Sequence, residues 1–352
     1  MGQSVSRQIN TLIIGAGHSG LAAAYQLKQR GIEFLIVDAK ARVGDNWRKR
    51  FTDLTLFTPN GINQLPGFVA PQSRGEFQTK DEFADYLEDY ATLHGLPVNL
   101  NERVVVVRQS GKEGFYVETD KARYQAERVV IATGAFKDGY RPVAITHNDV
   151  AQYDVAQLAL NQFERQSILV VGDGASGRQV AKSLARNNRV SLAQGTPRNL
   201  IKPKILGLSI FHWLRALGLL RLPKRFKLAK WLKQRDPFPD TAINDSALQR
   251  AGVRLLPKLV EYTQVARFAN GANKTFDAVV WATGYRNRYD YIELAGHAID
   301  PLRLENGDYE AQGLYAIGMA WQHNRASGLI YGAEFESTAL ANKLCQPNRL
   351  VR

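Results

Sequence analysis

The residues most suggestive of chemistry are the glycines of a GxGxxG turn, Gly15, Gly17 and Gly20, which follow the apolar run Thr11–Ile14. In such a turn the first glycine permits a tight bend, the second lets the backbone approach a pyrophosphate, and the third lets helix and strand pack closely. The N-terminus of the following helix offers free N–H groups and a partial positive charge to phosphates. Asp38, at the end of the next apolar run, is suited to accept hydrogen bonds from ribose hydroxyls. This pattern predicts a dinucleotide-binding unit.

A second turn of the same kind is formed by Gly172, Gly174 and Gly177. The position after its next apolar run carries Gln194, with no neighbouring carboxylate to repel a 2′-phosphate. Arg198 is equally well interpreted as a phosphate partner or as a solvated loop charge. The sequence therefore predicts weak discrimination between NADH and NADPH, and it predicts that Gln194→Arg improves the use of NADPH.

Two dinucleotide turns in one chain suggest two cofactors held face to face. Flavin with nicotinamide is the pairing that does chemistry, because hydride passes from nicotinamide C4 to flavin N5. The sequence shows no Ser-His-Asp set, paired carboxylates or zinc-like ligand spacing. We therefore expect FAD and NADPH or NADH to carry the reaction, while the protein positions the rings and excludes water.

The hydrophobic pattern predicts an α/β fold of two Rossmann-like dinucleotide-binding domains, the second inserted into the first. The FAD-binding domain is expected to comprise residues 1–160 and 278–352, and the NAD(P)H-binding domain residues 161–277, with a basic helical segment at 202–240. The predicted strands are 11–14, 34–37, 104–109, 115–119, 129–132, 167–171, 190–193, 278–281 and 314–317. The predicted helices are 21–30, 80–94, 178–186, 240–250 and 333–344. Thr79 with Glu82 forms the capping signal of the second of these helices.

Composition and charge exclude several other classes of protein. The chain is 45% hydrophobic and 22% charged, which is typical of a globular protein. One cysteine, Cys345, permits no redox dithiol, so a thioredoxin-reductase-like role is excluded. A single cysteine and no apolar leader lead us to expect a cytoplasmic protein, and no apolar run is long enough to span a bilayer.

The positive charge is concentrated in one stretch of the chain. The net charge is +13, and residues 202–235 supply ten basic side chains and no acidic one. A general affinity for nucleic acid is therefore not expected. Interleaved Phe211, Trp213 and leucines fit a helix on an anionic membrane or a funnel for an apolar substrate. We favour the plainer interpretation, a helical pair packed on the nicotinamide domain or against a second copy in a homodimer.

Six sequence blocks together resemble one family. IIGAGHSG, RVGDNW, LTLFTP, VVIATGAF, VVGDGASG and VVWATGYR, in that order, are similar to blocks of the flavin-containing monooxygenases, class B, over nearly the whole chain. The resemblance is to small bacterial members with relaxed preference between NADH and NADPH. It implies that the first turn holds FAD and the second NAD(P)H. It also implies that a flavin C4a-(hydro)peroxide oxygenates a thioether, an amine or a ketone, with molecular oxygen as co-substrate.

The resemblance also assigns residues. It places Phe57 and Asn60 at the flavin ring as the candidate catalytic residues, although Asn60 is equally typical of a turn. Together, the two turns and the resemblance predict these cofactor-binding residues: Gly15, Ala16, Gly17, His18, Ser19, Gly20, Asp38, Ala39, Gly44, Asn46, Trp47, Val104, Ala132, Thr133, Gly134, Gly172, Gly174, Ala175, Ser176, Gly177, Gln194, Arg198, Gly284, Tyr285, Gly318, Asn324 and Ala326. No metal ligand is predicted.

One family signature is degraded in this chain. In FxGxxxHxxx(Y/F), aligned on His147, Arg141 stands in the Phe position, Val143 in the Gly position and Ala151 in the last aromatic position. This departure bears on oxygenation more than on flavin reduction. The competing hypothesis is an NAD(P)H-flavin reductase or diaphorase without oxygenation. A non-enzymatic dinucleotide sensor would keep both turns but lose hydride transfer.

Overall fold

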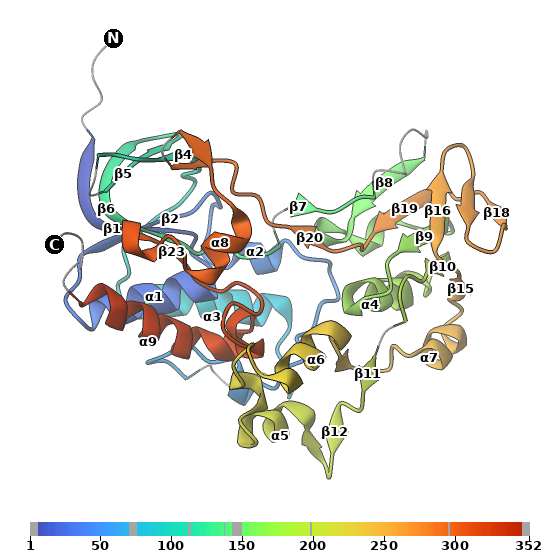
Figure 1. Ribbon diagram of the computed structural model, residues 1–352. Coiled ribbons are helices and arrows are strands. Elements are labelled where there is room, and N and C mark those ends of the chain that lie inside the picture. The colour runs from blue at the N-terminus through green and yellow to red at the C-terminus, as the bar shows by residue number, and fades with distance from the viewer. Residues whose placement is uncertain are drawn as a thin grey trace.

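The computed structural model describes residues 6–69, 76–111, 114–136, 138–142, 150–197, 199–294 and 296–346. Two halves, each built on its own sheet, lie next to each other, and the segment containing α5 (Ile210–Ala216) and α6 (Lys227–Arg235) lies below the gap between them (Figure 1). Within the described ranges, no helix combines the length and apolar character needed to span a bilayer.

The first half is built on a nine-stranded sheet in the order β22-β21-β4-β5-β6-β1-β2-β3, with β23 pairing with β6. Its strands are β1 (Arg7–Ile14), β2 (Phe34–Val37), β3 (Val98–Asn99), β4 (Val104–Gln109), β5 (Phe115–Thr119), β6 (Arg123–Ile131), β21 (Ile292–Leu294), β22 (His297–Ala298) and β23 (Leu314–Ala316). Strands β1, β2, β6 and β23 run parallel, so their carboxyl ends meet at one edge. Both ends of the chain thus build this half.

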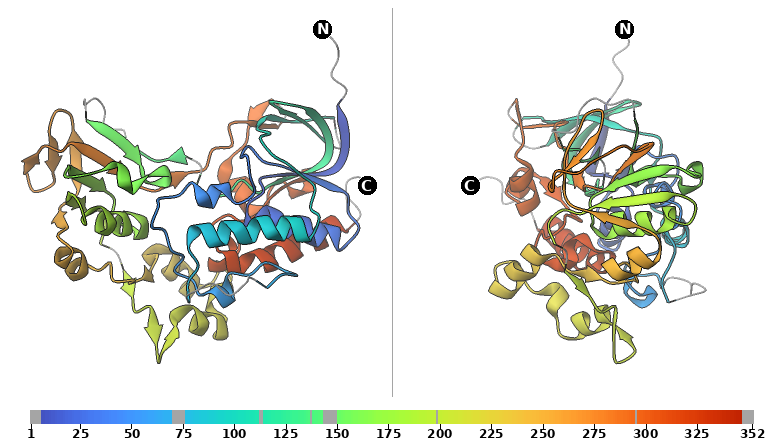
Figure 2. Two further views of the ribbon diagram at one scale, coloured as in Figure 1. Left: turned by 180° about the vertical axis from the view of Figure 1, so that it is seen from behind. Right: turned by 90° about the vertical axis from the view of Figure 1, so that its right-hand side faces the viewer.

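Three helices cover one face of this sheet: α1 (His18–Lys28), α3 (Lys80–Leu93) and α9 (Ala333–Leu344). Figure 2 shows them side by side from behind. In α1, Leu21, Ala22, Ala23 and Leu27 are fully buried, and the small side chains let the helix lie close to its neighbours. The predicted capping box of α3 is confirmed, because the Thr79 hydroxyl accepts from the N–H of Glu82 and the Glu82 carboxylate accepts from the N–H of Thr79.

The second half is built on a five-stranded parallel sheet in the order β15-β10-β9-β19-β8. Its strands are β8 (Ala151–Asp154), β9 (Ser167–Val171), β10 (Arg189–Ala193), β15 (Arg254–Leu256) and β19 (Ala278–Trp281), with helices α4 (Ala175–Leu184) and α7 (Asp245–Arg250) beside it. Strands β9 and β19 are buried almost throughout, as expected for parallel strands covered on both faces. A mixed sheet with parallel central strands and a second, fully parallel sheet, each with a strand–turn–helix unit, confirm the predicted α/β class.

The second sheet reaches beyond the predicted range 161–277 at both ends. Strand β8 pairs with β19 and β19 pairs with β9, so residues 151–154 and 278–281 belong to this sheet. The observed and predicted bounds differ because β8 and β19, which lie next to the crossings between the halves, pair within the second sheet and not the first.

Smaller elements connect and extend the halves. They are β7 (Asp138–Gly139) with β20 (Tyr285–Arg286), β11 (Leu200–Ile201) with β14 (Phe238–Pro239), β12 (Lys204–Ile205) with β13 (Leu208–Ser209), the sheet of β16 (Leu259–Tyr262), β17 (Ala266–Phe268) and β18 (Asn273–Lys274), and the helices α2 (Asp45–Arg48) and α8 (Pro301–Asn306).

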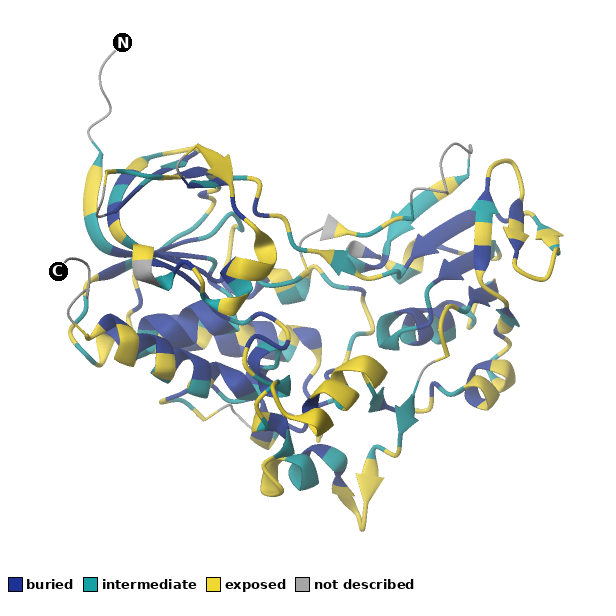
Figure 3. Cartoon of the chain, in the orientation of Figure 1, coloured by how far each residue is buried: buried dark blue, intermediate teal, exposed yellow. Residues whose placement is uncertain are grey.

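The basic segment, residues 202–240, was expected to pack on the nicotinamide domain, but its buried side chains contact the first half. Its buried side chains Phe211 and Leu220 form a cluster with Ile62 and Ala326 of the first half. The favoured packing on the nicotinamide domain is therefore wrong for this cluster, because its apolar partners lie in loops of the other half. Helix α6 buries only Ala229, Leu232 is half-buried, and the other side chains of this helix are exposed to solvent (Figure 3).

Candidate functional site

The first glycine turn joins β1 to α1 at the carboxyl edge of the first sheet. Gly15 has φ +111°, and a Cβ atom there would lie 2.6 Å from the carbonyl oxygen of Ala132. A Cβ on Gly20 would lie 2.0 Å from the carbonyl oxygen of Gly15. Both positions therefore require glycine for the fold itself. Gly17, the N-cap of α1, has no such obstacle, since its nearest atom would be Asn46 Nδ2 at 3.5 Å.

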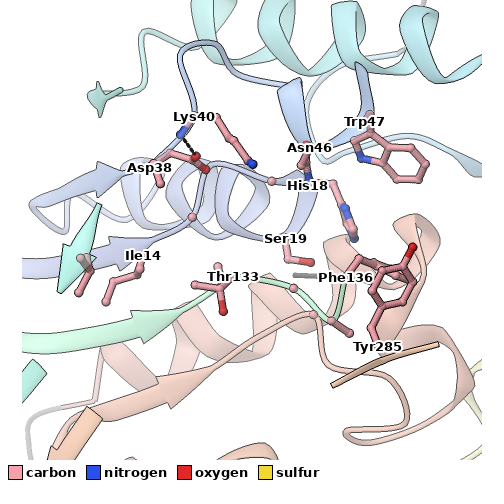
Figure 4. A pocket seen from close by; sticks show the side chains of 18 of the residues that line it. Ile14, His18, Ser19, Asp38, Lys40, Asn46, Trp47, Thr133, Phe136 and Tyr285 are labelled. Atoms are coloured by element: carbon pink, nitrogen blue, oxygen red, sulfur yellow. Dashed lines mark hydrogen bonds between the residues drawn. The ribbon is translucent and has the colours of Figure 1, made fainter. Parts of the chain in front are cut away.

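A pocket opens in front of this turn. The described residues that line it are Ile14, Gly15, Gly17, His18, Ser19, Val37, Asp38, Ala39, Lys40, Asn46, Trp47, Lys49, Arg50, Glu102, Arg103, Val104, Ala132, Thr133, Gly134, Ala135, Phe136, Ala156, Tyr285, Tyr291, Gly318, Ala320 and Gly328. Figure 4 shows Asp38 and Lys40 toward one end, and His18, Trp47, Phe136 and Tyr285 toward the other. The pocket therefore runs from the end of β2 to a residue that follows the second sheet.

Asp38 ties its strand to the turn. Its carboxylate accepts hydrogen bonds from the N–H of Ala16 at 2.7 Å and from the N–H of Lys40 at 2.8 Å. Such bonds to a charged acceptor are stronger than neutral ones. The carboxylate is thus held beside the pocket, in the position from which it would meet ribose hydroxyls.

Two buried nitrogen atoms at the other end of the pocket lack partners within the described part of the chain, His18 Nε2 and Trp47 Nε1. Burial, with a smaller effect from Arg50, lowers the pKa of His18 to about 4, so the ring is neutral at neutral pH. Unpaired buried polar atoms are costly, and a ligand that bonds to them would remove that cost.

Arg50 contributes a cation that the sequence did not single out. Its guanidinium carbon lies 4.8 Å from the ring centroid of Trp47 and 4.3 Å from that of Phe136. Burial lowers its pKa, and no carboxylate among the described residues forms an ion pair with it. A cation held between two aromatic rings is suited to an anionic or electron-rich ligand.

The charges around the pocket favour an anion. Four cations line it, Lys40, Lys49, Arg50 and Arg103, against two carboxylates. One of these, Glu102, already accepts hydrogen bonds from Thr119 and Tyr124. The glycine cradle, the helix N-terminus, the unpaired nitrogens and this excess of positive charge fit the pyrophosphate and rings of FAD.

The second turn repeats the construction between β9 and α4. A Cβ on Gly177 would lie 1.9 Å from the carbonyl oxygen of Gly172, whereas a Cβ on Gly174 would meet nothing within 4 Å. Ala175 and Ser176 begin α4, and Gln194 follows β10 directly. Space is thus open in front of this helix N-terminus, as a second pyrophosphate requires. Arg198 lies outside the described residues.

The structure separates the predicted residues into three groups. Those that line the pocket are Gly15, Gly17, His18, Ser19, Asp38, Ala39, Asn46, Trp47, Val104, Ala132, Thr133, Gly134, Tyr285 and Gly318. Those at the second turn are Gly172, Gly174, Ala175, Ser176, Gly177 and Gln194. Those outside the pocket lining are Ala16, Gly20, Gly44, Phe57, Asn60, Gly284, Asn324 and Ala326.

Some residues of the third group have a structural role. A Cβ on Gly44 would lie 2.4 Å from the carbonyl oxygen of Ala84, so this glycine lets α2 approach α3. Asn324 caps the turn Arg325–Gly328, where its side chain accepts from the N–H of Ala326.

The two candidate catalytic residues lie beside the basic segment. Phe57 stacks on Phe211, with ring centroids 5.7 Å apart and planes at 27°. Asn60 begins a short 3-10 turn, and its N–H donates to the carbonyl oxygen of Glu76. They are therefore neighbours of the apolar cluster under the basic segment, and neither lines the pocket described above.

The pocket includes residues that sequence reasoning missed. Lys40, Lys49 and Arg50 stand near predicted residues in the sequence, and a survey of the basic residues flanking the GDNW block would have found Arg50. Phe136 and Tyr291 come from distant segments that only the fold brings together.

Known proteins similar to this chain agree with the geometry. A model of the family described as pyridine nucleotide-disulphide oxidoreductase matches residues 12–205. A CzcO-like oxidoreductase of Geobacillus kaustophilus is 36% identical over 344 residues, covering 96% of this chain and 98% of its own. A probable indole-3-pyruvate monooxygenase of Arabidopsis thaliana, YUCCA1, is 28% identical, covering 87% of this chain and 84% of its own. The solved flavin-containing monooxygenase of Stenotrophomonas maltophilia has a TM-score of 0.78 at 22% identity, covering 96% of this chain and 98% of its own.

The family match spans the first turn, α1, β2, the second turn and β10, which are the elements that build both candidate sites. The chain belongs to the pyridine nucleotide-disulphide oxidoreductase family and is related to the CzcO-like oxidoreductases.

Proposed function

We propose that the chain is an NAD(P)H-dependent, FAD-containing monooxygenase that oxygenates a thioether, an amine or a ketone. The first turn and Asp38 would hold FAD, and the second turn would hold NADH or NADPH. When bound, FAD would accept hydride from the nicotinamide and activate molecular oxygen. The chain itself would bind, orient and shield these groups.

One observation carries the proposal. A single pocket is lined both by the first turn and by Tyr285, which stands in β20, a few residues after β19 of the second sheet. A flavin held by the first turn would therefore extend toward the half that carries the second turn. This arrangement supports hydride transfer between two cofactors better than binding of one isolated nucleotide.

The described residues suggest how water is kept from the rings. Trp47, Arg50 and Phe136 form a stacked group at the ring end of the pocket, next to neutral His18. Removing water there would strengthen electrostatic interactions and protect reduced flavin. Phe57 and Asn60 are proposed to border the substrate on the side of the apolar cluster.

The fate of molecular oxygen tests the proposal. Purified protein loaded with FAD is supplied with NADH or NADPH, thioanisole and ¹⁸O₂, and the products are analysed by mass spectrometry. Incorporation of ¹⁸O into the sulfoxide supports the monooxygenase. If a panel including an amine and a cyclic ketone also gives no labelled product, and peroxide forms in step with NAD(P)H consumption, the monooxygenase proposal is contradicted.

A flavin reductase or diaphorase is the second candidate, and one observation favours it. Arg141, in the phenylalanine position of the degraded signature, forms a bidentate pair with Asp154 at 2.9–3.0 Å on the surface. The segment that connects β7 to β8 thus has an ion pair where the family signature has an aromatic side chain. Val143 and His147 of the same signature lie outside the described residues. Peroxide yield in the ¹⁸O₂ experiment separates the two functions.

The basic segment suggests two partners, an anionic membrane surface and a second copy of the chain. At the hairpin of β12 and β13, Leu206 is 86% exposed, and Leu217 after α5 is 68% exposed. A symmetric dimer through this face would bring like charges together, because residues 202–235 carry ten cations and no acid. Weak contact with anionic lipid is therefore the partner we propose for this surface, in a cytoplasmic protein.

A further inference from the structure

Gln194 occupies the place in the second half that Asp38 occupies in the first. Asp38 follows β2 directly and Gln194 follows β10 directly, and each strand pairs in parallel with the strand that precedes its glycine turn. This is the position from which a Rossmann-type unit meets the adenosine ribose. The residues around Gln194 therefore decide whether a 2′-hydroxyl or a 2′-phosphate is accepted.

The carboxylate inside the second turn, that of Asp173, does not discriminate between a 2′-hydroxyl and a 2′-phosphate. Asp173 stands where the first turn has Ala16, and its side chain accepts from the N–H of Gly195 at 3.3 Å. The first half has a matching bond in the opposite sense. There the acid is Asp38 at the end of the strand, and it accepts from the N–H of Ala16 in the turn. Asp173 is only 1% exposed, so it braces the turn and is out of reach of a ribose.

A different carboxylate lies beside Gln194. Asp245, the first residue of α7, is 51 positions away in sequence, and Gln194 Nε2 donates to its Oδ1 at 3.3 Å. Arg178 Nη1 donates to the same oxygen at 2.8 Å. The side chain of Asp245 is still 56% exposed, so its charge is accessible to a ligand bound beside Gln194.

Arg178 does not cancel this negative charge for an incoming phosphate. Its guanidinium is 3% exposed and donates to the Asp173 carbonyl oxygen, the Ile243 carbonyl oxygen and Asp245. It also lies 3.5 Å from the Asp173 carboxylate, so one buried cation is shared by two acids. Arg178 is thus bonded to protein acceptors in the interior and does not reach a 2′-phosphate, whereas the Asp245 carboxylate is exposed.

We propose that Asp245 makes the chain select NADH over NADPH. This inference rests on the proposed use of the second turn, and it replaces the expectation of weak discrimination that the uncharged side chain of Gln194 alone suggested. A 2′-phosphate would meet the carboxylate of Asp245 at the position where like charges repel, whereas a 2′-hydroxyl can donate a hydrogen bond to it.

Binding of fragments that cannot transfer hydride tests this without relying on turnover. ADP-ribose and 2′-phospho-ADP-ribose are titrated calorimetrically into the FAD-loaded wild type and into Asp245→Asn. The asparagine keeps an acceptor for Arg178 and Gln194 but removes the charge. The ratio of the two dissociation constants should shift toward the phosphorylated fragment by roughly fivefold, the effect of one partly exposed charge. Asp308→Asn, which removes an exposed carboxylate paired with Arg303 in the first half, is the control and should leave the ratio unchanged.

Gln194→Arg leaves α7 unchanged, so this variant keeps the test sharp if Asp245→Asn perturbs that helix. An arginine at position 194 would pair with Asp245, so Gln194→Arg alone should change the ratio little, which replaces the improvement predicted from the sequence. The double variant Gln194→Arg/Asp245→Asn should change the ratio most, and a large shift in Gln194→Arg alone would count against Asp245. An unchanged ratio in both Asp245 variants would overturn the role of Asp245 alone. If the wild type bound neither fragment, the proposed use of the second turn would fail with it.

Discussion

The carboxylate of Asp38 accepts a hydrogen bond of 2.7 Å from the N–H of Ala16, which joins the end of β2 to the middle of the first glycine turn. This bond holds the ribose-side acid and the phosphate-side backbone in one rigid unit. The electrostatic and steric properties of the proposed FAD site therefore depend on both residues together.

Asp38→Ala should weaken FAD binding about 10- to 100-fold, because hydrogen bonds to a charged group contribute roughly 1.5–3 kcal/mol. Flavin fluorescence on titration of the apoprotein measures the change. Asp89→Ala, which removes an exposed carboxylate on α3, is the matched control and should bind FAD like the wild type. Equal FAD affinity in Asp38→Ala and the control would remove Asp38 from the site.

Gly174→Ala should separate cofactor binding from folding at the second turn. The added Cβ meets no protein atom, so Tm should fall by no more than about 2–4 °C from loss of a good N-cap. The methyl group would enter the space in front of the helix, and KM for NADH and NADPH should rise about tenfold or more. Gly177→Ala, which collides with the backbone of Gly172, should instead lower Tm much further. A Gly174→Ala enzyme with unchanged KM for both donors would contradict pyrophosphate binding here.

Burial lowers the pKa of His18 to about 4, and this makes the apoprotein sensitive to acid. As pH falls through 6.5 the unfolded chain takes up a proton on His18, while the folded chain does not until about pH 4. The folded state should therefore lose about 2 kcal/mol of stability by pH 5 from this residue. Urea unfolding at pH 7.5 and pH 5 should show a smaller acid loss in His18→Gln than in wild type. His297→Gln, on exposed β22, is the control, and an equal loss in all three proteins would refute the effect.

The elements that sequence predicted well are those whose signals are local. The strands at 34–37, 167–171 and 278–281 have the predicted bounds, because apolar runs covered on both faces leave little ambiguity. The starts of α1 and α4 were predicted three residues late, since each helix begins directly after the second glycine of its turn and not at its first apolar residue.

The site was predictable where it is contiguous in sequence and unpredictable where the fold assembles it. The first turn and the GDNW block supply neighbouring pocket residues, and both were named in advance. Phe136 and Tyr291 reach the pocket from separate strand ends, and Asp245 reaches Gln194 from 51 positions away. No spacing rule links such residues, because the distance between them is set by sheet order and helix packing.

Leu206→Asn should reduce binding to anionic vesicles without harming the fold. Leu206 and Gly207 have φ values of +50° and +79° in the two-residue turn of a hairpin, where asparagine is favoured over leucine. Co-sedimentation with phosphatidylglycerol vesicles should fall in this variant and in Lys224→Glu/Arg225→Glu/Lys227→Glu. Leu302→Asn, equally apolar and 69% exposed on α8, should sediment like the wild type. No sedimentation of wild type with phosphatidylglycerol, or equal sedimentation with neutral phosphatidylcholine, would rule out this surface as a lipid contact.

Anaerobic reduction of the flavin by a nicotinamide tests the two-cofactor arrangement most directly. Purified protein is loaded with FAD, mixed with NADH or NADPH in a stopped-flow instrument without oxygen, and followed at the main visible absorption band of the flavin. We predict one tightly bound FAD per chain and complete bleaching by both donors at high concentration, with NADH effective at the lower concentration. A colourless protein that takes up no FAD, or a bound flavin that neither donor reduces, would contradict the account.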